Sequence, residues 1–483
     1  MYNTAKKAYG IILMLSLFLC TGITSVGQKI WTLEDCINWA LTNNLDIKNQ
    51  VLTVEANKKQ LLQSTLSMLP NLNANGTNTW NFGQTIDLYT NTFATGTVLS
   101  NNFSISTNMT LFGGLTKLNT VKQNQINILA SNYDLDVIRN NISLAVAGYY
   151  LDILLNTALL EVARAQLEVT KDQVSRIGKR VEAGSSARGD LLNIQAQAAG
   201  EELAVVTAEN NLYISNLTLQ QLIDLPVSKD FVIEKPQLKA VEAPKELFTP
   251  DQMFGYAVMN RPEIKAAEMR VKSYQKSLAI PRGSVSPVLS FGASWGTGYS
   301  GAANEINRNI PPDTTYFPVG YTQNTHETVL AESINYQYRV KSFSDQISSN
   351  DYKSFGFNLS VPIFNGWLGR TAIAQAKIQM DKADVNLDIQ KRDLRKSIEQ
   401  AYADAVASLK KYNSSTSQVE AQQESFKYTQ EKFDVGLLTS FDFNNSKKDL
   451  IKAQSDLLQA KFDFIFKTTI LNFYMGKPIS INQ

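Results

Sequence analysis

The chain has 483 residues and 46 Lys and Arg side chains against 44 Asp and Glu, charges that cancel once Lys6 and Lys7 are set aside. This balance excludes a protein that recognises nucleic acid or another polyanion by charge. The sequence has one His, two Cys, no phosphate-binding loop, no cluster of metal-binding residues and no motif for an acid and base pair. This residue content argues against an enzyme and predicts no cofactor and no metal.

Residues 1–27 have the pattern of a secretory signal peptide. Lys6 and Lys7 precede a short apolar run, small residues follow at Ser25 and Gly27, and cleavage is expected before Gln28. The apolar run is too short for a permanent membrane helix, which needs about 20 residues, although an uncleaved anchor is the alternative.

Cysteine usage fits an exported protein that is stabilised by packing. Removal of the signal peptide takes Cys20 away and leaves Cys36 alone, so no internal disulfide can form. Lipidation at Cys20 would require a small residue before it, and Leu19 is not small. After the signal no apolar stretch of 18 residues is evident, so we expect any membrane segment to be a β-strand.

The remaining chain contains an internal repeat. Five short segments of the first copy each have a matching segment in the second copy. The number of residues between matching segments is larger from the third match onward, which predicts one insertion in the second copy between about Ser300 and Asp351. This segment is rich in Asn, Ser, Thr, Gly and Pro, and we expect a long extracellular loop outside any barrel wall. The matching segments are Asn44 to Ile47 with Arg261 to Ile264, Leu69 to Leu72 with Ser286 to Leu289, Leu111 to Gly114 with Ile363 to Gly366, Glu182 to Gly184 with Asp434 to Gly436, and Pro226 with Pro478.

Each copy is predicted to contain a helix, a strand, a loop, a strand and two long helices joined by a sharp turn. The first repeat covers 28–226, a linker covers 227–249, and the second repeat covers 250–483. In the first repeat we expect strands at about 70–87 and 101–112 and long helices at about 115–183 and 188–225. In the second we expect strands at about 287–299 and 352–364 and long helices at about 367–435 and 440–475.

The second strand of each copy alternates apolar and polar residues with a period of two, as a strand with one apolar face does. The apolar members are Phe103, Ile105, Met109 and Leu111 in one copy, and Phe355, Phe357, Leu359, Val361 and Ile363 in the other.

The helix that follows runs without a proline for roughly 69 residues, or about 100 Å. Apolar residues at heptad spacing predict coiled-coil packing, and an ordinary helical bundle core would explain the spacing as well. The heptad positions are Leu160, Ala163, Leu167, Thr170, Val174, Ile177 and Val181, and in the second copy Ile398, Ala405, Tyr412, Val419, Phe426 and Phe433.

Four strands are too few to close a barrel around a pore, and an open strand edge is not tolerated in lipid. The chain is therefore expected to oligomerise, and three copies would supply about 12 strands, enough for an open pore.

The turns between the long helices carry a specific resemblance. Arg180 to Gly184 followed by Asp190, and Lys432 to Gly436 followed by Asp442, both show a basic residue, an apolar residue, two further residues, Gly, five residues and Asp. With the strand pairs upstream, the mature chain resembles the TolC-like outer membrane efflux protein family over nearly its whole length.

The resemblance implies a homotrimer with a 12-stranded β-barrel in the outer membrane of a Gram-negative bacterium, continued by a long α-helical coiled-coil tunnel in the periplasm. It implies a passive conduit, with outer-membrane lipid, a periplasmic adaptor protein and an inner-membrane transporter as partners. The rival interpretation is a soluble periplasmic coiled-coil adaptor or scaffold, which would leave the strand pairs unexplained.

The resemblance also suggests a periplasmic gate. Asp442 stands where the family has a ring of carboxylates, Asn445 takes the second position of the usual pair, and Asp190 is the matching residue of the first copy. Three carboxylates near one axis would attract cations. The alternative for Asp442 and Asp190 is a helix N-cap.

The turns themselves are the expected adaptor-docking tips, at Gly184, Ser185, Gly436, Leu437 and Thr439. The two glycines also suit the positive φ angle that ends a helix. Some family members have a polar lock of Tyr and Arg around the second glycine, and Phe433 and Leu438 put that lock in doubt here.

Trp80 and Trp295 are expected near the outer ends of the first strands, as aromatic residues at the membrane interface, unless they pack between protomers. His326, the single histidine, falls in the predicted loop and is expected to be solvated.

Overall fold

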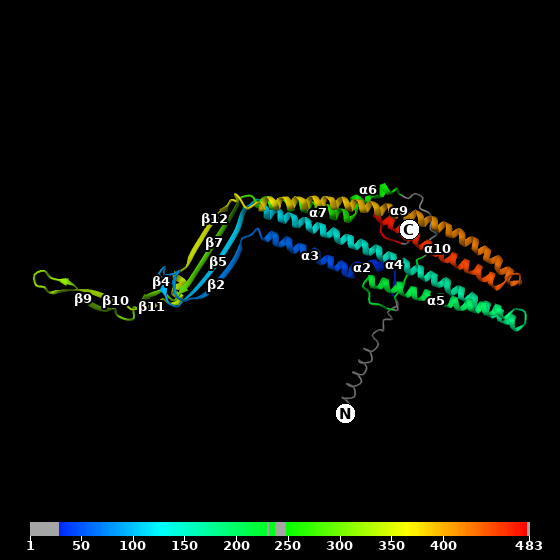
Figure 1. Cartoon of the computed structure of the whole chain (residues 1–483), viewed down its shortest axis with the longest axis horizontal. Coiled ribbons are helices and arrows are strands. Elements are labelled where there is room, and N and C mark those ends of the chain that lie inside the picture. Colours follow the sequence, from blue (N-terminus) through cyan, green and yellow to red (C-terminus); the bar gives the residue numbers. More distant parts are fainter. Residues whose placement is uncertain (1–28, 229–230, 237–247, 481–483) are drawn as a thin grey trace, which may run out of the picture. The chain divides into compact units, whose positions relative to one another are not determined.

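The computed structural model describes residues 29–228, 231–236 and 248–480, so the predicted signal peptide and Cys20 lie outside the described residues (Figure 1). The chain divides into two compact units. Unit 1 comprises Met1–Val54, Ala130–Glu268 and Asn386–Gln483, and unit 2 comprises Glu55–Leu129 and Met269–Val385. Four helices contribute residues to both units: α3 (Leu45–Leu66), α4 (Thr116–Glu182), α7 (Pro262–Ser284) and α9 (Leu368–Asp434).

Unit 2 contains a four-stranded antiparallel sheet in the order β12-β7-β5-β2, which Figure 1 shows as four strands side by side. Its strands are β2 (Asn71–Asn81), β5 (Val98–Gly113), β7 (Val288–Ser300) and β12 (Tyr352–Ser360). Within the described chain, β12 and β2 each pair on one side only, so both ends of the sheet are open edges.

The strand boundaries depart from the sequence prediction at the ends of β2 and β12, and β5 begins at Val98 rather than at about 101. The first strand stops at Asn81 rather than continuing to 87, and Gly83 adopts a φ of 94° that breaks the extended chain. The last strand stops at Ser360 rather than 364, because Pro362 has no N–H to continue the ladder.

A short hairpin joins β2 to β5. It consists of β3 (Gln84–Ile86) and β4 (Phe93–Thr95), and we call residues 82–97 the β3–β4 hairpin. Asp87 anchors it, because its carboxylate accepts hydrogen bonds from the Ser300 hydroxyl and from the backbone N–H of Thr90 at 2.8 Å.

The insertion between β7 and β12, predicted as a long loop, contains regular structure that the sequence analysis did not predict. It forms a two-stranded ribbon of β8 (Asn304–Ile306), β9 (Asp313–Tyr321), β10 (Thr328–Asn335) and β11 (Tyr338–Val340), followed by α8 (Phe343–Ser349). The strands are rich in β-branched and aromatic residues, which favour extended structure. The ribbon strands pair with each other and are separate from the four-stranded sheet.

Unit 1 is mainly helical. It adds α2 (Leu33–Asn43), α5 (Arg188–Leu222), α6 (Pro250–Asn260) and α10 (Ser440–Tyr474) to its parts of the four shared helices. A two-residue parallel pairing joins β1 (Ile30–Trp31) to β6 (Val232–Ile233), so the predicted linker contains a strand in its described part.

Some of the predicted heptad positions of both long helices are buried in unit 1, and the others are half-buried. Leu160, Leu167, Thr170 and Ile177 of α4 are buried, as are Ile398 and Ala405 of α9. A larger core cluster gathers α2, α4 and α5 around Cys36, Val146, Tyr150 and Leu219, among others.

One described helix, α4, is long and apolar enough to cross a membrane by length and composition, so the expectation of no such stretch is wrong. Its apolar side chains include Val146, Ala147, Leu151 and Ile153, which are buried in the core of unit 1. Packing in this core accounts for part of the apolar composition, since 39% of the apolar window is buried.

Candidate functional site

The two hairpin turns between the long helices have the same backbone geometry. Gly184 and Gly436 have φ angles of 72° and 81°, in the left-handed region that glycine enters without strain. The next N–H reaches back five residues in each turn, from Ser185 to Arg180 at 2.8 Å and from Leu437 to Lys432 at 2.9 Å. These bonds satisfy free carbonyls at the ends of α4 and α9, as the sequence predicted for a helix-ending glycine.

Asp442 lies in the first turn of α10 and is exposed. Thr439 is the N-cap residue, and its hydroxyl accepts a hydrogen bond from the Asp442 backbone N–H at 3.2 Å. In return the Asp442 carboxylate accepts from the Thr439 hydroxyl at 2.6 Å and from its backbone N–H at 3.3 Å. The alternative of Asp442 as N-cap is therefore wrong, and Asp442 is the third residue of a capping box.

Asp190 occupies the corresponding position of α5 but does not cap it. The N-cap there is Ala187, which has no side chain able to accept a hydrogen bond, so the capping alternative for Asp190 is wrong. Instead the Asp190 carboxylate accepts a hydrogen bond from the Ser440 hydroxyl at 3.1 Å. This bond connects the start of α5 to the start of α10.

The remaining tip residues are mostly in contact with solvent. Ser185, Leu437, Thr439 and Asn445 are exposed, and Leu437 retains 74% of its accessible surface. Arg180 donates a hydrogen bond to the backbone carbonyl of Asp434 at 3.2 Å, a second connection between the two turns.

Aromatic contacts hold α9 and α10 together near the turn. Phe443 is fully buried, and its ring lies 4.8 Å from that of Phe433 and 5.3 Å from that of Phe426. Phe433 therefore packs in the contact between α9 and α10.

A buried polar cluster, which the sequence analysis missed, joins α10 to α4 and α5. The Lys447 ammonium donates to the Gln166 carbonyl and the Glu201 carboxylate, both at 3.1 Å, and to the Thr170 hydroxyl. Gln197 donates to the same carboxylate at 2.8 Å. Burial lowers the pKa of Lys447, and the charge of Glu201 opposes that change.

A seven-residue spacing could have revealed this cluster. Ser440, Lys447 and Gln454 occupy equivalent heptad positions on α10, and each hydrogen-bonds a side chain of α4 or α5. Polar residues at successive seam positions are uncommon in coiled coils and specify which helices pair.

The sheet of unit 2 places the two tryptophans differently. Trp80 is the next-to-last residue of β2 and is exposed, as expected for the end of a strand. Trp295 lies inside β7, opposite Ile105 and Lys353 and five residues before the end of the strand at Ser300. Its predicted place at a membrane interface stays a prediction. His326 has a φ of 53° and is exposed in the turn between β9 and β10.

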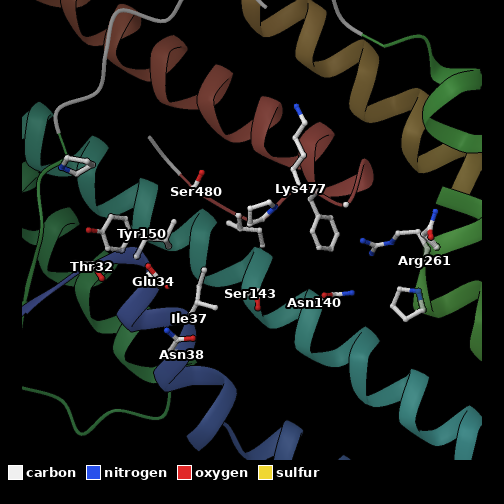
Figure 2. A pocket seen from close by; sticks show the side chains of 18 of the residues that line it. Thr32, Glu34, Ile37, Asn38, Asn140, Ser143, Tyr150, Arg261, Lys477 and Ser480 are labelled. Carbon is white, nitrogen blue, oxygen red and sulfur yellow. The ribbon is translucent and has the colours of Figure 1, made fainter. Parts of the chain in front are cut away.

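Unit 1 contains a cavity of about 780 Å³ (Figure 2). Figure 2 shows Thr32 and Glu34 from the start of α2, Asn140 and Ser143 from α4, and Arg261 around it. Arg261 is nearly buried, forms an ion pair with Glu263 at 2.9 Å and stacks over the ring of Phe473. Its charge is thus already paired within the fold. In the residues that the structure describes, no group of three His, Cys, Asp or Glu side chains is placed to hold a metal ion.

A family model described as outer membrane efflux protein matches residues 36–224 and 255–465, which is most of the chain. The chain belongs to this family. Membership confirms the resemblance found in the turns and the outer-membrane location.

Relatives within the family support this assignment. The chain is 21% identical over 316 residues to the alkaline protease secretion protein AprF of Pseudomonas aeruginosa, covering 65% of this chain and 56% of AprF. It is 19% identical over 464 residues to the outer membrane efflux protein BepC of Brucella suis, covering 96% of this chain and 89% of BepC.

The fold is also similar to that of a solved family structure. The crystal structure of CusC superposes with a TM-score of 0.73 at 16% identity, covering 92% of each chain. This likeness confirms the predicted mixture of strands and long helices.

Proposed function

We propose that this efflux family protein is a homotrimeric channel in which each chain contributes four strands to a 12-stranded transmembrane barrel. The observation that carries the proposal is the sheet with open edges at β12 and β2. Strand edges cannot remain unpaired in lipid, so β12 of one copy would pair with β2 of the next until the barrel closes.

The long helices would continue the barrel as a periplasmic tunnel. The helices α4 and α9 each have 67 residues, and α5 and α10 each have 35. These equal lengths support two tandem repeats, at 28–226 and 250–483, joined by the linker 227–249 and preceded by a signal peptide at 1–27. A helix of 67 residues extends for about 100 Å, which would carry the turns deep into the periplasm.

The exposed tips, with Gly184, Ser185, Gly436, Leu437 and Thr439, would bind a periplasmic adaptor that couples the channel to an inner-membrane transporter. Their support is the pair of tight turns with uncovered side chains and backbone. The protein would supply the conduit, and energy and catalysis would belong to the transporter.

The gate would lie beside these tips. Asp442 and Asn445 are exposed on the first turns of α10, and three copies around one axis would bring three Asp442 carboxylates together. Asp190 would be part of the gate through its hydrogen bond with Ser440, which joins the start of α5 to the start of α10. Asn445 is neutral, so the ring would be less negative than one with two carboxylates per chain.

In the barrel, Trp80 would lie at the lipid interface, where indole rings are favoured. Trp295 would lie closer to the membrane middle or face a strand neighbour, since it is inside β7. The position of Trp80 would make outer-membrane lipid a partner of the protein.

Cell fractionation combined with surface proteolysis tests the proposal. We expect the protein in detergent-extractable outer membrane, with cleavage of intact cells in the ribbon between β8 and β11. Soluble periplasmic protein would contradict a channel and favour a scaffold. Protection of the ribbon with cleavage near Gly184 would contradict the proposed orientation.

A further inference from the structure

The β3–β4 hairpin of unit 2 has an uncovered apolar surface. Leu88 retains 86% of its accessible surface, and three other large apolar side chains are also exposed. Such a cluster on one short hairpin is typical of a surface that another molecule covers. The four side chains are Phe82, Ile86, Leu88 and Phe93.

Polar contacts hold the other side of this hairpin against its own chain. Asp87 is buried against the Ser300 hydroxyl at the end of β7, and the Tyr89 hydroxyl donates to Asn102 of β5 at 3.3 Å. The hairpin is therefore fixed on the sheet while its apolar side chains remain free.

The root of the ribbon, defined here as β8, β11 and α8, is fixed in the same way. The Gln346 side chain is buried and donates to the carbonyls of Ser300 and Lys341, both at 2.9 Å. Apolar side chains nevertheless remain exposed at the root, among them Ile306, Tyr338 and Val340. A two-stranded ribbon is marginal on its own, so covering these side chains would stabilise it.

The strand order determines which surfaces become neighbours in an oligomer. The hairpin connects β2 to β5 and the ribbon connects β7 to β12, so both lie at the same end of the sheet. In the order β12-β7-β5-β2, the strands β12 and β2 are at opposite edges. When β2 of one copy pairs with β12 of the next, the hairpin of the first copy comes beside the ribbon root of the second.

We infer that the apolar side of the β3–β4 hairpin packs against the ribbon root of the neighbouring copy, so that the contact between copies continues beyond the barrel wall. The inference rests on the proposed trimer. The occupant is a second copy of this chain, because the open β2 edge brings that copy to this side of the hairpin in every closed ring.

The charges of the ribbon disfavour a lipid headgroup as the alternative partner. Residues 313–335 contain three acidic side chains, Asp313, Glu327 and Glu332, and no Lys or Arg. An anionic membrane surface would repel β9 and β10. At the root, Arg339 of β11 is already paired with Glu305 of β8 at 2.7 Å and is not free to bind a lipid phosphate.

Cross-linking with a short bifunctional maleimide tests the contact. The double variant Ile86→Cys with Tyr338→Cys should give covalent dimers and trimers on denaturing gels. The matched control is Thr85→Cys with Tyr338→Cys, because Thr85 precedes Ile86 on β3 and faces the opposite side. Equal cross-linking in both variants, or cross-linking only within one chain, would overturn the inference.

Stability of the oligomer gives a second readout. Leu88→Ser and Tyr338→Ser should each lower by several degrees the temperature at which the unheated oligomer band disappears from a gel. Their combined shift should be smaller than the sum, since residues in one contact are coupled. Additive shifts would overturn the inference and leave the trimer intact, whereas the absence of an oligomer in the unmodified protein would overturn the proposed function.

Discussion

The ammonium of Lys447 lies 3.1 Å from the Glu201 carboxylate, and these two side chains are only 1% and 9% exposed. They belong to different hairpins of unit 1, Lys447 to α10 and Glu201 to α5. A buried ion pair stabilises little in net terms, but removing one partner leaves an uncompensated charge.

We therefore expect Lys447→Met to lower the free energy of unfolding by about 3 kcal/mol, since Glu201 keeps only its hydrogen bonds from Thr170 and Gln197. Lys447→Met combined with Glu201→Leu should recover most of this loss. Urea unfolding in detergent measures both. A double variant as unstable as the single one would show that the charge pair itself stabilises the contact.

The gate is tested by Asp442→Asn. Asn retains a side-chain oxygen that can accept from Thr439, so α10 should remain capped. If three Asp442 carboxylates line the constriction, single-channel currents of the unmodified trimer should be cation-selective and blocked by multivalent cations from the periplasmic side. The variant should lose both properties.

Thr439→Ala is the matched control for this variant. It removes the N-cap oxygen while the carboxylate stays, and should cost about 1 kcal/mol of stability with little effect on ion selectivity. Unchanged selectivity in a correctly assembled Asp442→Asn trimer would leave Asp442 with a capping-box role alone.

Adaptor docking is tested with cysteines at the exposed turns. Ser185→Cys and Leu437→Cys should cross-link to a periplasmic adaptor in cells, since both side chains are uncovered and neither provides the cap of α10. Labelling of these cysteines in intact cells by a membrane-impermeant reagent would show that the turns face the outside of the cell, and would contradict their proposed periplasmic location.

Cys36 gives a pH-dependent prediction. Its side chain is completely buried, and this burial raises the pKa of the thiol from 9.0 to about 12. In a Cys20→Ser background, the folded protein should resist maleimide between about pH 7 and 9 and react after unfolding in urea.

The same pKa shift sets the sign of the stability change. Between about pH 9 and pH 12 the thiol ionises in the unfolded chain before it ionises in the folded one, so the stability of the folded state falls with rising pH. Cys36→Ala should remove this contribution. An unchanged pH dependence of unfolding in that variant would contradict the assignment.

The strands and long helices could be predicted because period-two alternation and heptad spacing record which faces are buried. The ends of the strands depend on particular residues. Gly83 and Pro362 end the extended chain earlier than the predicted strand limits allowed. The ribbon was missed because Asn, Ser, Thr, Gly and Pro residues between its apolar positions favour loops by composition.

The tips could be predicted only in part. Gly184 and Gly436 were recognisable because a long helix must end and glycine accepts a positive φ. The role of Asp442 as third residue of the capping box follows from Thr439, three residues earlier, which was not considered as the cap. The Lys447 cluster depends on contacts between three helices distant in sequence, which local spacing alone does not assign.

The central claim is that three copies of this chain close one barrel through β12 and β2. Native mass spectrometry of the detergent-extracted protein tests it most directly, because the number of chains fixes the number of strands available. We predict a single species with the mass of three chains. A monomer, or a stable assembly with another number of copies, would contradict the account.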